Sequence, residues 1–98
     1  MPRRMQDLPD EYLTIQRTLA RAIGARLRVR RDALEMTQEQ LRARMELEHV
    51  YTSRTQYSRI EIGDALPNAA EIIALCAILD VTFDWLLLGT EARDSDSH

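Results

Sequence analysis

The sequence predicts an all-α protein in which five short-to-medium helices pack around one core. Three observations lead to this class. No alternation of apolar and polar residues lasts long enough for a strand, apolar residues recur at three- and four-residue intervals, and capping residues, glycines and prolines divide the chain into helix-length segments. With 98 residues, of which 45% are hydrophobic, the chain has enough material for one small domain.

The first helix is expected over residues 10–34. Pro9 and Asp10 are typical of a helix start, because proline and acidic residues both favour the first turn. The pattern fits one long helix, and a break near Gly24 is the alternative. The apolar residues at helical spacing are Tyr12, Ile15, Leu19, Ile23, Leu27 and Leu34.

A second helix is expected from Gln38 to about Glu46. Thr37 is a suitable N-cap, and Gln40 follows three residues later, as in a capping box. The apolar positions of this helix are Leu41 and Met45.

A third helix should begin at Arg54, after Ser53 as its N-cap, and end near Ile62, because Gly63 and Asp64 form a stop and a turn. Its inward residues are Tyr57 and Ile60, at i and i+3. Its outward or flanking residues are Arg54, Thr55, Gln56, Ser58 and Arg59.

The fourth and fifth helices are expected over Ala69–Leu79 and Phe83–Leu88. Pro67 and Asn68 precede the fourth helix, and Thr82 caps the fifth, which ends at Gly89. The acidic segment 90–98 should be disordered, since it has one apolar residue in nine. The buried stripe of the fourth helix should comprise Ile72, Ile73, Leu75, Cys76 and Leu79.

The charge of the chain is unevenly distributed. The net charge is −3, yet residues 1–62 hold twelve arginines and nine acids, whereas residues 63–98 hold one arginine and seven acids. Between Tyr12 and Arg31 there are six arginines and no acid. This local positive charge fits either a solvated helix face or a surface that meets nucleic acid.

Several functional classes are disfavoured. No run of 18 apolar residues and no apolar signal core occurs, so neither a membrane span nor secretion is expected. The single Cys76 fits a reducing cytoplasm, and its neighbours indicate the core. We find no metal-ligand spacing, phosphate loop or nucleophile motif. The expectation is therefore a cytoplasmic protein that is not an enzyme and has no metal or cofactor.

The third helix carries the chemistry that base recognition requires. An α-helix fits the major groove of DNA, where arginine pairs with guanine and glutamine with adenine. A polar outer face over an apolar inner face suits that task, but an ordinary amphipathic surface helix has the same pattern.

Three segments together resemble the lambda-repressor-like family of phage repressors and bacterial XRE-type (Cro-like) regulators. They are TQEQL at Thr37–Leu41, SRTQYSRIEIG at Ser53–Gly63 and LDVTFDWLLLG at Leu79–Gly89. The resemblance runs from about Ile23 to Gly89. It implies a five-helix helix-turn-helix domain over residues 23–89, preceded by a helical extension over residues 1–22.

The resemblance also implies roles for individual residues. Arg54, Thr55 and Ser58 would read bases, flanked by Gln56 and Arg59. The phosphate contacts would come from Gln38, Ser53 and Asn68. Arg31 and Glu61 match a charged pair that ties the first helix to the third, and Phe83 and Trp85 would be core residues.

The chain departs from the family pattern around the turn before the third helix. The distance from Gln38 to Glu61 is about five residues longer than usual, and the extra residues fall within Glu46–Thr52. Arg42 replaces a small residue, and the turn glycine is missing. Glu35 replaces a glycine, and Arg30 stands where an apolar residue is common. The enlarged turn should add a turn to the second helix or form a short loop towards solvent or DNA, with Val50 or Tyr51 packed on the core.

The leading hypothesis is a sequence-specific transcriptional regulator that binds double-stranded DNA as a homodimer on a two-fold operator. The alternative is a protein-interaction module or antitoxin-like partner protein on the same fold. The dimer candidates are Tyr12, Ile15, Leu19, Leu86, Leu87 and Leu88. This apolar surface could be covered by the fifth helix of the same chain or by a second chain, and we expect the second chain because a palindromic operator needs two reading helices.

Overall fold

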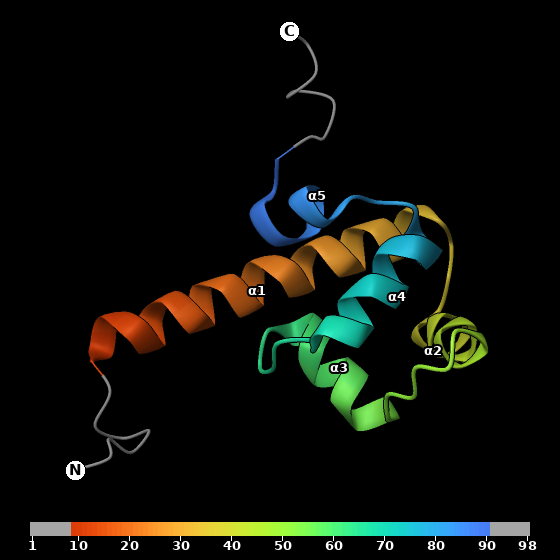
Figure 1. Cartoon of the computed structure of the whole chain (residues 1–98), viewed down its shortest axis with the longest axis horizontal. Helices are drawn as coiled ribbons and strands as arrows, with labels where there is room; N and C mark the ends of the chain where they lie inside the picture. Colours follow the sequence, from red (N-terminus) through yellow and green to blue (C-terminus); the bar gives the residue numbers. More distant parts are fainter. Residues whose placement is uncertain (1–8, 91–98) are drawn as a thin grey trace, which may run out of the picture.

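The computed structural model describes residues 9–90, and within them the secondary structure is entirely helical (Figure 1). The predicted all-α class is thus confirmed, with all five helices within one or two residues of the expected bounds. The helices are α1 (Asp10–Ala33), α2 (Gln38–Leu47), α3 (Arg54–Ile62), α4 (Ala69–Leu79) and α5 (Phe83–Leu88). Most of the tail that was predicted to be disordered lies outside the described residues.

Helix α1 is one continuous helix of 24 residues, so the alternative of a break near Gly24 is wrong. Gly24 is instead a point of close approach to α3. A Cβ atom on Gly24 would lie 2.4 Å from the backbone oxygen of Ile60 and 2.5 Å from that of Glu61. The glycine therefore allows the two helices to touch at their backbones.

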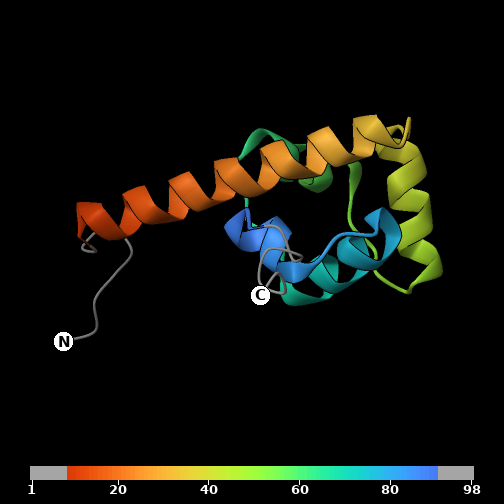
Figure 2. The ribbon, with the colours of Figure 1, turned by 90° about the horizontal axis from the view of Figure 1, so that it is seen from above.

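The N-terminal half of α1 extends beyond the other helices, which gather around its C-terminal half (Figures 1 and 2). Ala20, Ile23 and Leu27 are buried in α1, whereas Tyr12 and Ile15 are exposed. The other helices therefore cover only the C-terminal part of the apolar stripe of α1, and the N-terminal part is left exposed.

The predicted caps are present and fix the helix starts. The hydroxyl of Thr37 accepts from the backbone N–H of Gln40, whose side chain returns a bond to the backbone N–H of Thr37. The hydroxyls of Ser53 and Thr82 accept from the backbone N–H groups of Gln56 and Trp85 at the starts of α3 and α5, and Gly63 ends α3 with a φ of 87°.

One core unites the five helices. Its fully buried large side chains are Ile23, Leu27, Leu41, Met45, Tyr57, Ile60, Leu75, Leu79 and Leu86. The predictions that Ile73 and Phe83 belong to the core are wrong, because these residues are 60% and 50% exposed. Two residues correspond to about 200° around a helix, so Ile73 lies on the side of α4 opposite to the buried Leu75.

Three arginines of α1 bind to the other helices. The guanidinium of Arg26 donates to the carbonyl oxygen of Leu86 at 2.8 Å, and that of Arg30 donates to the carbonyl oxygen of Leu79 at 2.7 Å. These carbonyl groups lie in the last turns of α5 and α4, where carbonyl oxygens have no N–H partner within their own helix. Arg31 binds Glu61 of α3. Three of the six arginines between Tyr12 and Arg31 therefore stabilise the packing of the helices. From the sequence, we expected only a solvated face or a nucleic-acid surface for these charges.

Candidate nucleic-acid interface

The outer face of α3 is polar, and its first turn is open to solvent. Arg54 and Thr55 are exposed, directly after the N-cap Ser53. Gln56 and Ser58 are half-buried. The helix is anchored from the opposite side by the fully buried Tyr57 and Ile60. The sequence prediction of the inner and outer faces of this helix is thus confirmed.

Arg59 is also exposed, but it lies in the last turn of α3. Its guanidinium donates to the carbonyl oxygen of Asp64 at 3.3 Å, in the turn that follows the helix. Arg59 is therefore less free to reach a base edge than Arg54.

The three candidate phosphate-binding residues lie at the N-termini of helices, where backbone N–H groups and the helix dipole attract anions. The side-chain oxygens of Ser53 and Asn68 accept capping bonds from Gln56 and Glu71, so their hydroxyl and amide hydrogens remain as donors. The side-chain amide of Gln38 donates to Glu61 at 3.0 Å and retains its second N–H. Their contacts with DNA remain a prediction.

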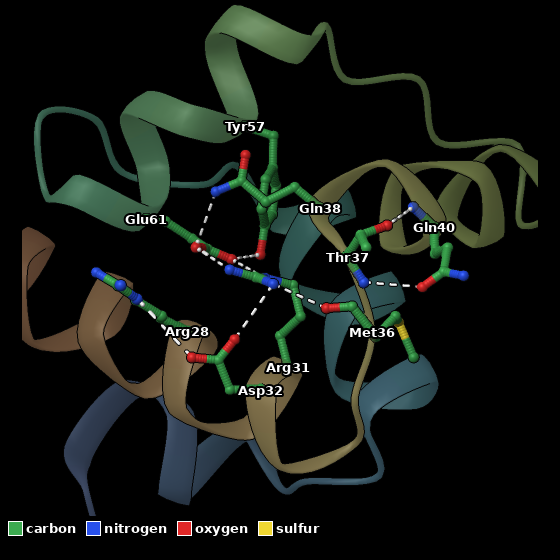
Figure 3. A network of polar contacts seen from close by, with 9 residues as sticks. All are labelled: Arg28, Arg31, Asp32, Met36, Thr37, Gln38, Gln40, Tyr57 and Glu61. Carbon is green, nitrogen blue, oxygen red and sulfur yellow. Dashed lines mark hydrogen bonds and ion pairs between the residues drawn. The ribbon is translucent and has the colours of Figure 1, made fainter.

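Behind this surface, Glu61 receives hydrogen bonds from three helices (Figure 3). Arg31 of α1 donates through Nε at 2.7 Å and Nη2 at 2.9 Å, one bond to each carboxylate oxygen. Tyr57 donates its hydroxyl at 2.7 Å, and Gln38 of α2 donates its amide. The arginine also donates to the carbonyl oxygen of Met36 at 2.8 Å. The expected Arg31–Glu61 contact is therefore present, within a network that joins α1, α2 and α3.

This network shifts the pKa of its members. Burial by itself would raise the pKa of Glu61, but the hydrogen bonds from Arg31, Tyr57 and Gln38 outweigh it and hold the pKa below its ordinary value. Burial raises the pKa of the Tyr57 hydroxyl, and the bond to Glu61 raises it further. Glu61 is therefore a carboxylate at neutral pH, and Tyr57 is a neutral donor to it.

The enlarged turn forms a loop between α2 and α3. Helix α2 ends at Leu47, and the chain turns at His49, whose φ is 64°. His49 thus occupies the left-handed region that usually favours glycine. Of the two predicted conformations, the chain therefore adopts the short loop. Of the two residues predicted to pack on the core, Val50 does so and Tyr51 is exposed.

A second polar cluster, which the sequence interpretation missed, holds the end of this loop. The hydroxyl of Thr52 donates to Oε2 of Glu71 in α4 at 2.6 Å, and Nε of Arg42 in α2 donates to the carbonyl oxygen of Thr52 at 2.9 Å. The other oxygen of Glu71 accepts from the backbone N–H of Asn68 at 2.8 Å, in a capping box. The three-residue spacing from Asn68 to Glu71 was the signal in the sequence.

The candidate dimer residues separate into three groups. Tyr12, Ile15 and Leu88 are exposed. Leu19 and Leu87 are partly buried against the core of their own chain. Leu86 is fully buried there, and its selection as an interface residue is therefore corrected. For Leu86, the alternative that the fifth helix packs within its own chain is therefore the correct one.

Residues 22–84 match the model of a helix-turn-helix domain family. The chain is also similar to the HTH-type transcriptional regulator DicA of Escherichia coli (strain K12), with 36% identity over 71 residues. That match covers 72% of this chain and 49% of DicA, so the chain spans about half the length of this curated relative. No solved structure matches the chain significantly. Within residues 9–90, no helix is both long enough and apolar enough to span a membrane.

Proposed function

Because this chain belongs to the helix-turn-helix domain family, we propose that it is a sequence-specific DNA-binding transcriptional regulator that acts as a homodimer on a two-fold operator. The observation that carries the proposal is the first turn of α3, where Arg54 and Thr55 stand exposed on a helix anchored by Tyr57 and Ile60. In helix-turn-helix proteins, the first turns of the second helix contact base edges in the major groove.

The arrangement of polar donors supports the same function. Ser53 and Asn68 keep a free donor at the starts of α3 and α4. Donors of this kind bind phosphates and fix the register of a protein on the duplex, whereas side chains such as that of Arg54 read the sequence. The proposed surface thus has both parts of a specific interface.

Selection from a random-sequence DNA library, followed by anisotropy titration at several salt concentrations, tests the proposal. We expect enrichment of a two-fold motif and an affinity that falls steeply with salt, because phosphate contacts release counterions. A library that shows no enrichment, with no salt-sensitive binding, would contradict it.

Arg54→Ala should weaken operator binding by about 1–3 kcal/mol and relax the preference at one operator position, because the guanidinium pairs with a base edge. Binding to random DNA should fall much less. The matched control is Arg28→Ala, which removes the same charge from an exposed position on α1. Equal losses on both DNA types, or equal effects of the two variants, would show that α3 is not the reading helix.

For the dimer, we propose that Tyr12, Ile15 and Leu88 pack against a second copy. Tyr12 and Ile15 lie within one turn of each other on α1 and are both exposed, and two-fold operators need two reading helices. Helix α5 of the same chain covers part of α1 but leaves Ile15 63% exposed.

Ile15→Asp should convert the dimer to a monomer in analytical ultracentrifugation at tens of micromolar and weaken operator binding. Burying an unpaired carboxylate in an apolar interface costs more than the association gains. The control is Ile73→Asp on α4, where the native side chain is 60% exposed, and this variant should remain dimeric. A monomeric wild-type protein would refute the proposed dimer.

The same exposed part of α1 motivates a second candidate, a module that binds another protein instead of DNA. This candidate predicts that the DNA library gives no enrichment, and that variants at Ile15 abolish a protein complex while variants at Arg54 leave it intact.

A further inference from the structure

The residues Arg42, Thr52 and Glu71 form a cluster and are not among the residues proposed to contact DNA. Arg42 and Glu71 both bind Thr52, and Thr52 directly precedes Ser53, a proposed phosphate contact. We infer that this cluster, here named the loop clamp, is a positioning device that sets the orientation of the first turn of α3 for base recognition. The inference rests on the proposed function. It deepens that function by assigning specificity to residues that touch no base.

The position of Thr52 in the chain is the first step. Thr52 immediately precedes Ser53, whose hydroxyl accepts from the N–H of Gln56 and whose carbonyl oxygen accepts from the N–H of Tyr57 at 2.9 Å. Any displacement of Thr52 therefore moves the N-cap of α3, and Arg54 moves with it. Side chains that read bases must be held within fractions of an ångström by supporting groups.

The second step is that Thr52 is held from two helices at once. Arg42 of α2 binds its backbone oxygen, and Glu71 of α4 binds its hydroxyl. Thr52 and Glu71 are both at least nine-tenths buried. The start of α3 is therefore fixed relative to α2 and α4, while the Arg31–Glu61 pair fixes its end relative to α1.

The third step is that the clamp holds a loop that has no stiffening residue of its own. The loop from Glu48 to Ser53 contains no proline, the residue whose ring fixes a backbone dihedral. Such a loop leaves the chain conformational freedom. The long side chain of Arg42 reaches the last part of this loop and binds the carbonyl oxygen of Thr52, which restricts that freedom.

The burial of Glu71 needs partners, and the clamp supplies them. Its two oxygens accept from the N–H of Asn68 and from the hydroxyl of Thr52, and it lies in the first turn of α4, where the helix dipole favours negative charge. Among residues 9–90, no buried polar side-chain atom lacks a partner. Removing the Thr52 hydroxyl leaves one oxygen of the buried Glu71 without its donor. It removes no group of the proposed DNA surface.

The test uses Thr52→Val, which removes the hydroxyl at nearly constant volume, and Thr52→Ser, which retains it. We expect Thr52→Val to lower operator affinity about tenfold, comparable to the loss of one base contact, with unchanged affinity for random DNA. Thr52→Ser should keep the wild-type ratio of operator affinity to random-DNA affinity. The control is Cys76→Ala, which removes a buried atom of α4 about one and a half turns from Glu71 and should leave the ratio unchanged.

Amide hydrogen exchange without DNA gives an independent measurement. In Thr52→Val, the N–H groups of Gln56 and Tyr57 should exchange faster than in the wild type, whereas those of the C-terminal part of α1 should not.

The outcomes separate the two proposals. A wild-type protein that does not discriminate an operator overturns the proposed function and the positioning role with it. A wild-type protein that discriminates, with a Thr52→Val variant that discriminates equally well, overturns the positioning role alone. Equal loss in Thr52→Val and Thr52→Ser also overturns it, since the hydroxyl would then be irrelevant.

Discussion

Replacing Arg31 with Met should lower the free energy of unfolding by about 3–5 kcal/mol, measured by chemical denaturation. Glu61 is 3% exposed and Arg31 is 11% exposed at the side chain. Removing the arginine therefore leaves a buried carboxylate with only Tyr57 and Gln38 as donors. For a small domain, this loss is a large part of the total stability.

The same helix offers the matched control. Arg28 and Asp32 also form an ion pair, at 3.9 Å, but their side chains are 70% and 60% exposed. Arg28→Met should cost less than about 0.5 kcal/mol. The double variant Arg31→Met with Glu61→Leu should recover only part of the loss, because it leaves no unpaired charge but removes the acceptor of the buried Tyr57 hydroxyl. Similar losses for Arg28→Met and Arg31→Met would contradict this account.

Glu61 should also make the protein sensitive to acid. Its pKa in the folded state lies below the ordinary value of 4.5, so the unfolded chain binds a proton more readily. The stabilisation by Glu61 is then complete above pH 4.5 and is lost as the pH falls towards the folded-state pKa. Glu61→Gln should flatten this part of the curve of unfolding free energy against pH. An unchanged slope below pH 4.5 would contradict the assignment.

Gly24→Ala should destabilise the protein by about 2 kcal/mol, although alanine favours a helix by about 1 kcal/mol. The new Cβ would overlap the backbone oxygens of Ile60 and Glu61, and backbone atoms cannot move aside as a flexible side chain can. Helices α1 and α3 would have to separate, which would also strain the Arg31–Glu61 pair.

Thermal unfolding of Gly24→Ala and Ala25→Gly separates packing from helix propensity. Ala25 is the next residue and is exposed, so Ala25→Gly should follow propensity alone and lose about 1 kcal/mol. If Gly24→Ala raised the melting temperature, the close approach of the two helices would not matter to stability.

The sequence by itself determined the helices and which face of α3 is polar and turned outwards. Thr37, Ser53 and Thr82 are caps whose effect is local, and the spacing of Tyr57 and Ile60 fixes which side of α3 faces inwards. These features depend on neighbours within one or two turns, so a linear pattern is sufficient to predict them. The resemblance added the Arg31–Glu61 contact, which joins residues 30 positions apart.

The tertiary structure alone decided which residues act across helices. The linear pattern did not decide whether Gly24 is a break in α1 or a contact point with α3. It did not indicate that Arg26 and Arg30 bind the ends of α5 and α4. It also did not decide whether Leu86 belongs to the core or to an interface. The same holds for the loop clamp, where Arg42, Thr52 and Glu71 come from three elements. Each of these roles depends on the distance between segments far apart in the chain, and packing sets that distance, whereas periodicity and capping report only on residues a few positions apart.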